Sequence, residues 1–82
     1  MAYRLILDDS ALDQLRALPK EIRRNIGYRI ELLQDGLQGD VRKLAGERHR
    51  YRLRVGEYRV LFRIDGGVIR VYAVKQRKEA YE

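Results

Sequence analysis

Residues 50–64 read RYRLRVGEYRVLFRI, and this stretch decides the fold. Apolar and aromatic residues alternate with charged ones on both sides of a Gly-Glu turn. This pattern predicts a hairpin of two strands, because successive side chains of a strand point to opposite faces. The apolar face of the hairpin is expected to be buried. The other face carries Arg52, Arg54 and Arg59, which must contact water or an anion because an unpaired buried charge is too costly.

The chain before the hairpin predicts a strand and two helices. Residues 2–7 alternate as a strand that places a tyrosine and two leucines on one face. Ser10 and Asp13 fit a capping box, in which each side chain accepts a backbone N–H at the start of a helix. Pro19 ends this short helix and suits the first turn of the next one.

The second helix is expected over residues 20–34, where four apolar side chains recur at helical spacing. Gly27 lies inside it and should weaken the helix by roughly 1 kcal/mol relative to alanine, unless it permits close packing against a neighbour. Residues 36–48 are expected to form a connection, with Gly39 and Gly46 as breakers.

After the hairpin, an Asp-Gly-Gly turn precedes a last strand over residues 68–74. Alternation places Ala73 on the same face as Val71, and Val74 on the same face as Tyr72. The predicted order is therefore β-α-α-β-β-β. We expect an α+β fold of two layers, with the N-terminal helical hairpin packed on an antiparallel sheet and the arginine face left open.

The length of 82 residues predicts one domain, residues 1–82, with a single core. Hydrophobic residues make up 45% of the chain, which argues against disorder. The sequence has no cysteine and one histidine, so neither a metal nor another cofactor is expected. No apolar run approaches the length of a membrane span and no signal peptide is visible, which predicts a cytoplasmic protein without a membrane partner.

The distribution of charge points to an anionic partner. Residues 1–41 hold 6 Lys/Arg and 7 Asp/Glu, a net charge of −1, whereas residues 42–82 hold 12 Lys/Arg and 5 Asp/Glu, a net charge of +7. A one-sided basic field attracts polyanions and speeds their encounter. Arginine binds phosphate through a planar fork and stacks on bases, so nucleic acid is the favoured partner.

Such a surface could bind RNA or cleave it without a metal, through attack of the ribose 2′-OH on its own phosphate. Cleavage needs in-line positioning, positive charge around the phosphorane, a base and an acid. Arginine is effectively never deprotonated, so the candidate bases are Tyr81, Lys75 and Lys78, each with a pKa lowered by clustered cations. His49 is another acid–base candidate, and we favour its interpretation as a solvent-exposed histidine. Lys43 is a further candidate phosphate ligand.

The chain resembles the RelE/ParE superfamily of bacterial toxins from type II toxin–antitoxin systems over nearly its full length. The matching features are the order of elements, the KLAG segment at residues 43–46, the hairpin at residues 51–64 and RKEAY at residues 77–81. The resemblance implies a toxin neutralised by a cognate antitoxin, for which charge complementarity predicts an acidic protein. RelE-like members cut mRNA on the ribosome, whereas ParE-like members inhibit DNA gyrase and are not nucleases.

By position, the resemblance assigns phosphate contacts to Arg52 and Arg54 and catalytic roles to Arg59, Arg77 and Tyr81. RelE-like nucleases often carry lysines at the first two positions, and many relatives have a histidine where this chain has Gln76. Arg59, Arg77 and Tyr81 favour a RelE-like mRNA endoribonuclease. The alternatives are a ParE-like gyrase inhibitor and an inactive basic RNA-binding relative.

Overall fold

The predicted hairpin forms the centre of a five-stranded sheet in the structure, a computed structural model that describes residues 3–46 and 48–77. The elements in chain order are β1 (Arg4–Leu7), α1 (Asp9–Arg16), α2 (Lys20–Leu32), a 3-10 turn (Leu33–Asp35), β2 (Asp40–Lys43), β3 (Arg50–Val55), β4 (Tyr58–Asp65) and β5 (Val68–Gln76). Val55 lies opposite Tyr58, so only Gly56 and Glu57 connect the two strands of the hairpin.

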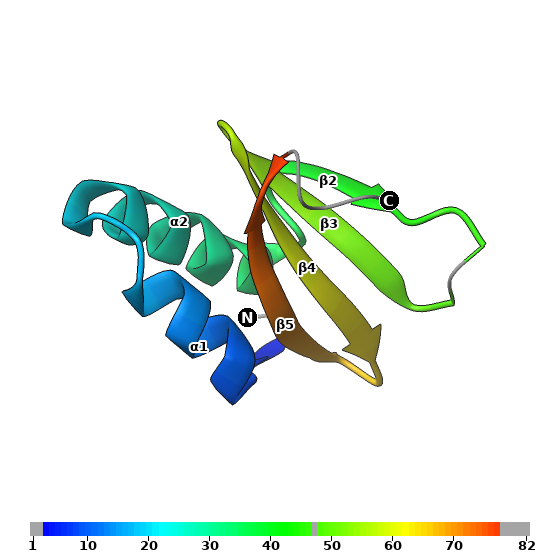
Figure 1. Ribbon diagram of the computed structural model, residues 1–82. Coiled ribbons are helices and arrows are strands. Elements are labelled where there is room, and N and C mark those ends of the chain that lie inside the picture. The colour runs from blue at the N-terminus through cyan, green and yellow to red at the C-terminus, as the bar shows by residue number, and fades with distance from the viewer. Residues whose placement is uncertain (1–2, 47, 78–82) are drawn as a thin grey trace.

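The sheet has the strand order β1-β5-β4-β3-β2, and both helices cover the same face of it (Figure 1). This arrangement confirms the expected two-layer α+β fold. The four strands from β2 to β5 are antiparallel, whereas β1 pairs with β5 in parallel, which makes the sheet mixed rather than wholly antiparallel. None of the helices in the two described ranges is long and apolar enough to cross a membrane.

The segment predicted as a connection contains the edge strand β2. Val41 of β2 lies opposite Leu53 of β3 and packs against the core. The strand is only four residues long and has one apolar side chain, so alternation gives too short a signal to predict it. Short, charged strands are typical of sheet edges, where they discourage pairing with other chains.

Gly39, immediately before β2, has a φ of 115°, which favours glycine. A Cβ built there would lie 2.8 Å from Leu53 Cδ1. The glycine was predicted as a breaker, and its function in the fold is to bring the backbone close to β3.

The start of α1 differs from the predicted capping box. The helix begins at Asp9, its N-cap residue is Asp8, and the structure assigns that residue no side-chain capping hydrogen bond. The Ser10 hydroxyl instead donates to the backbone oxygen of Tyr72 on β5 at 3.0 Å. Tertiary contact with the sheet has overridden the local capping preference, and it joins the helical layer to β5.

The core lies between the helices and the sheet. Its fully buried large side chains are Ile26, Ile30, Leu33, Leu53, Val60, Phe62, Ile69 and Val71. Tyr51 stacks on Phe62 with ring centroids 5.7 Å apart and an interplanar angle of 15°. The predicted packing roles of the helix isoleucines and of this tyrosine are confirmed. Gly27 meets no atom within 4 Å of a built Cβ, so the close-packing explanation for this glycine is wrong.

A β-bulge between β4 and β5 changes which side chains of β5 face the core. Phe62 pairs with Val71 and Leu61 pairs with Ala73, so Tyr72 is the extra residue. As a result Val74 belongs to the core and Ala73 points to the other face, the reverse of what strict alternation predicts. A bulge inserts one residue without a partner and shifts the alternation beyond it.

Candidate nucleic-acid interface

Both helices lie on one side of the sheet, which leaves its other face uncovered by them (Figure 1). This second face carries a dense set of cations and is here called the basic face. Residues directly opposite one another on paired strands point to the same side, so the register defines its members. Its cations are Arg4, Arg42, Arg50, Arg52, Arg54, Arg59, Arg63, Arg70 and Lys75. The prediction that arginines from adjacent strands share one face is confirmed.

A first row of cations crosses three strands near the β3–β4 turn. Arg54 on β3 lies directly opposite Arg59 on β4, and Arg59 lies directly opposite Lys75 on β5. Neighbouring strands are about 4.8 Å apart, so the three side chains leave the backbone within about 10 Å of one another. Arg54 is exposed and the other two are half-buried, and the Nε and Nη1 atoms of Arg59 are shielded from solvent.

The middle row of the basic face is buried, which corrects the expectation of an open Arg52. Arg52, Leu61 and Ala73 are exposed by 5%, 8% and 6% respectively. Arg52 Nη1 donates to the backbone oxygen of Asp40 at 3.1 Å and lies 3.5 Å from its Oδ1. A buried cation needs such partners. Arg52 therefore ties β2 to β3, and its guanidinium is not displayed to solvent as Arg54 is.

A second row of cations crosses the same strands at the other end of the face. Arg50, Arg63 and Arg70 occupy directly opposite positions on β3, β4 and β5. Arg63 and Arg70 are exposed, and the guanidinium carbon of Arg50 lies 5.5 Å from the ring centroid of Tyr72. The sequence showed these arginines, but their alignment into a row depends on the register of the three strands.

The chain leaves β5 beside the first row. Gln76 lies opposite Tyr58, and the backbone N–H of Arg77 donates to the oxygen of Glu57 at 2.7 Å. Arg77 is exposed at this end of the sheet. The expectation that the tail starts near the first-row arginines is thus confirmed. Lys78 and Tyr81 lie outside the described residues.

Two other candidates lie away from the first row. Lys43 on β2 lies opposite Tyr51, so it projects from the side of the sheet that faces the helices, although it is exposed at the edge. His49 is exposed in the turn before β3, with a φ of 63°, and its backbone oxygen accepts from Ile64 N–H. It therefore lies at the opposite end of the hairpin from Arg59, and the interpretation as a surface histidine is supported.

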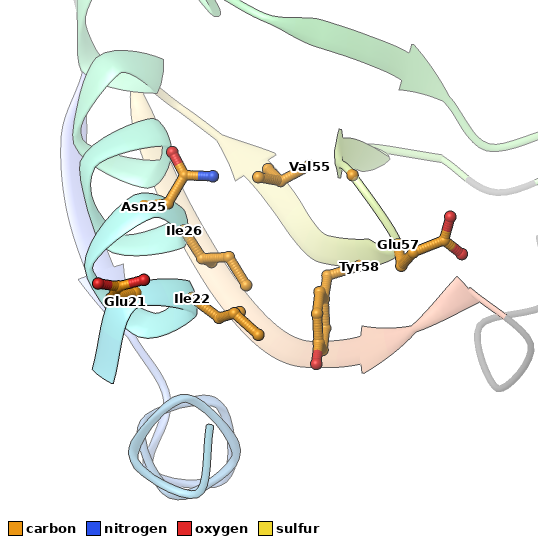
Figure 2. A pocket seen from close by; sticks show the side chains of 8 residues that line it. Glu21, Ile22, Asn25, Ile26, Val55, Glu57 and Tyr58 are labelled. Carbon is orange, nitrogen blue, oxygen red and sulfur yellow. The ribbon is translucent and has the colours of Figure 1, made fainter. Parts of the chain in front are cut away.

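A groove of about 300 Å³ lies on the helical side of the sheet, between α2 and the β3–β4 turn (Figure 2). Ile22 and Ile26 of α2 form one wall, and Val55 and Tyr58 form the other. Tyr58 thus packs on the helical side, as its place in the alternation predicts, and does not belong to the basic face.

Comparison with known proteins shows similarity to toxins of toxin–antitoxin systems. The family "ParE toxin of type II toxin-antitoxin system" matches residues 5–81. The toxin RelE3 of Methanocaldococcus jannaschii is 34% identical, and the match covers 83% of each chain. The toxin chain in the RelE–RelB complex of Pyrococcus horikoshii superposes with a TM-score of 0.80 at 30% identity, covering 98% of this chain and 100% of that one. The isolated RelE toxin of E. coli gives a TM-score of 0.78 at 25% identity, covering 92% and 84%.

The chain belongs to the RelE/ParE superfamily of toxins from type II toxin–antitoxin systems, and its likeness is to RelE-like members.

Proposed function

We propose that this toxin is a ribosome-dependent mRNA endoribonuclease whose catalytic centre lies at the first row of the basic face. The observation that supports this most directly is the direct cross-strand alignment of Arg54, Arg59 and Lys75, with Arg77 returning to the same end of the sheet. Several cations gathered in one row on one face can bind a phosphate group.

The chemistry would be attack of the ribose 2′-OH on the adjacent phosphate. The O2′–P bond forms and the P–O5′ bond breaks, so the products carry a 2′,3′-cyclic phosphate and a free 5′-OH. The 2′-OH proton passes to a base, and the departing O5′ receives a proton. Arg54 and Arg59 would stabilise the negative charge that accumulates on the phosphorane oxygens, which is often the largest single catalytic term.

The remaining roles come from the family resemblance. Arg77 would stabilise or protonate the leaving oxygen, and Tyr81 would stack on a base or orient the 2′-OH. Lys75 or Lys78 would supply additional phosphate contacts. Arginine is a poor base, and such an acid–base set is inefficient by itself. The need for an external scaffold that holds the RNA in line is consistent with action on the ribosome.

The test is to add purified protein to a translating extract and to map the ends of the mRNA. Wild-type protein should produce new 5′ ends within translated reading frames. Arg59→Ala should reduce the cleavage rate by about 10²- to 10³-fold, the range for loss of one preorganised electrostatic contact. Arg24→Ala removes an exposed arginine from α2 and serves as the matched control. Intact mRNA with the wild-type protein would refute the proposal.

A second candidate is inhibition of DNA gyrase, which is favoured by the match to the ParE toxin family. The two candidates make opposite predictions with purified components. A gyrase inhibitor should block supercoiling of plasmid DNA by gyrase and leave mRNA in the extract intact. A nuclease should cleave mRNA and leave supercoiling unchanged.

A cognate antitoxin is the partner that the family implies, and relatives from Pyrococcus horikoshii and Methanococcus jannaschii form RelB–RelE complexes. With a net charge of +6 and nine cations on one face, this toxin should bind an acidic antitoxin. We expect the antitoxin to be encoded by the reading frame next to that of the toxin. Affinity of the purified pair should fall as salt rises, and a salt-independent affinity would contradict the electrostatic model of binding.

A further inference from the structure

The second row of the basic face has no role in the chemistry described above. Arg50 and Arg63 lie directly opposite each other, as do Arg63 and Arg70. Like charges directly opposite one another on paired strands destabilise a sheet. Asp8 offsets part of this cost at Arg70, and an anion bound across the row would relieve the repulsion further.

The distance between the rows separates the two sites. Arg50 and Arg54 on β3, like Arg59 and Arg63 on β4, are four residues apart. At about 3.3 Å per residue the rows are about 13 Å apart, which one phosphate group cannot span. The buried middle row, with Leu61 and Ala73, lies between them. A strand bound across the face would thus place different phosphates on the two rows.

Tyr72 gives this second row a feature that a simple cluster of charges lacks. The bulge makes it the extra residue of β5, and the Arg50 guanidinium reaches across β4 to lie 5.5 Å from its ring centroid. A guanidinium held against an aromatic ring is a flat, preorganised platform. Flat groups of this kind stack unpaired bases, which favours single-stranded RNA over a duplex.

We infer that Arg50, Arg63, Arg70 and Tyr72 form a second RNA subsite, which holds the phosphodiester backbone of a single strand at least one nucleotide away from the phosphate at the first row. The inference rests on the proposed RNA-directed function and extends it from one phosphate to a bound strand. Asp8 opposes this binding, since its Oδ1 accepts from Arg70 Nη1 at 2.8 Å and neutralises one of the three cations.

The first experiment measures the affinity of purified protein for a labelled single-stranded RNA made uncleavable by 2′-O-methyl groups. Each phosphate contact to a single strand contributes about 0.7 to the slope of log affinity against log salt. Salt of 0.1 M is one decade below 1 M, where this contribution vanishes, so Arg63→Gln should weaken binding about fivefold at 0.1 M salt. Arg63→Lys should retain most of the affinity. Arg24→Gln removes the same charge from α2 and should change affinity by less than about twofold. Equal affinities of Arg63→Gln and wild type would overturn the inference.

A variant at Asp8 should raise the affinity for RNA, whereas Arg63→Gln should lower it. Asp8→Asn removes the carboxylate that neutralises Arg70 while leaving an asparagine at the start of α1, where this residue type is well tolerated. It should tighten RNA binding, and unchanged or weaker binding would count against the subsite. The thermal midpoint of Arg63→Gln should equal or exceed that of wild type, because a like-charge contact is removed. A lower midpoint would contradict the repulsion on which the inference is based.

Two further probes distinguish the ligand. Tyr72→Ala should weaken the binding of a duplex RNA hairpin less than it weakens the binding of the single strand. An equal or larger loss of affinity for the duplex would overturn the single-strand assignment. Binding of polyglutamate tests for a general attraction of polyanions. If Arg63→Gln lost as much affinity for polyglutamate as for RNA, the row would instead be a surface that binds acidic proteins. mRNA cleavage by wild type with no effect of Arg63→Gln on RNA affinity would refute the subsite alone. The expected affinity changes without cleavage would refute the nuclease function alone.

Discussion

Arg52 on β3 fastens the edge strand β2 through Asp40, which accepts from Arg52 Nη1 with its backbone oxygen at 3.1 Å and places its carboxylate 3.5 Å away. Arg52 lies directly opposite Arg42, and Asp40 lies directly opposite Arg54, so the contact between Arg52 and Asp40 runs diagonally across the two strands. The guanidinium is almost fully buried, whereas the Asp40 side chain is half exposed. Arg52 is thus a structural residue of the hairpin as well as a candidate for phosphate binding.

Arg52→Ala should lower the free energy of unfolding by about 2 kcal/mol, because it removes a charged hydrogen bond to a backbone oxygen and the packing of the side-chain stem. Arg54→Ala, two residues along the same strand but exposed, should change it by less than about 0.5 kcal/mol. Urea denaturation of both variants measures the difference. Equal stabilities would show that the Asp40 contact does not stabilise the fold. Any loss of activity in Arg52→Ala must be corrected for this loss of stability.

The stacked pair of Tyr51 and Phe62 predicts where the core is least tolerant. Phe62 is fully buried and its ring lies 5.7 Å from that of Tyr51. Phe62→Ala should cost about 3–5 kcal/mol, from lost transfer free energy and the cavity that remains. Tyr28→Ala is the aromatic control, since Tyr28 is 59% exposed, and it should shift stability by less than about 0.5 kcal/mol. Thermal unfolding followed by circular dichroism compares them, and a small effect of Phe62→Ala would contradict the assigned core.

The hairpin, the two helices and the shared face of Arg54 and Arg59 could be predicted because their patterns are long enough for the period to be visible. Lys75 could be placed on that face only through the register. The strand β2 could not be predicted, since its four residues have a single apolar side chain. The bulge at Leu61 and Phe62 gives no sign in the sequence, and alternation therefore placed Ala73 and Val74 on the wrong faces.

Two parts of the site also escaped prediction for physical reasons. The burial of Arg52 depends on Asp40, which comes from the edge strand that the pattern did not reveal. The alignment of Arg50 with Arg63 depends on strand register, which turn length and packing determine together. The sequence alone can therefore predict which face of a strand a charged residue occupies. It cannot predict whether that residue is exposed or which residues lie opposite it on the neighbouring strands.

Gly27→Ala should stabilise the protein by about 0.8–1.0 kcal/mol, because glycine in the interior of a helix is unfavourable by that amount relative to alanine. The position is in α2, and an added Cβ would have no atom within 4 Å, so the new methyl group causes no clash. Chemical denaturation checks the value. A loss of stability would indicate that α2 needs this glycine for a reason other than packing.

Gly39→Ala should have the opposite effect. The backbone at Gly39 has a φ of 115°, and the new Cβ would lie 2.8 Å from Leu53 Cδ1 and 3.3 Å from Arg29 Nη2. The substitution combines backbone strain, of order 1–3 kcal/mol, with displacement of a core leucine. The same denaturation series should therefore place this variant below wild type, and wild-type stability would contradict the close approach before β2.

The first row of the basic face predicts a conflict between stability and activity. Arg54 lies directly opposite Arg59, and a like-charge pair in this position destabilises a sheet by roughly 0.2–1 kcal/mol. Arg54→Thr removes this repulsion together with the opposite-charge pairing of Arg54 with Asp40 on β2, and it introduces a residue that is better suited to strands, so on balance the free energy of unfolding should rise. The same variant removes one phosphate contact, so mRNA cleavage in a translating extract should fall. The two quantities are measured on one preparation, by urea denaturation and by mapping of mRNA ends. A variant that is both less stable and less active would show that Arg54 supports the fold, and the functional interpretation of the row would then rest on Arg59 and Lys75 alone.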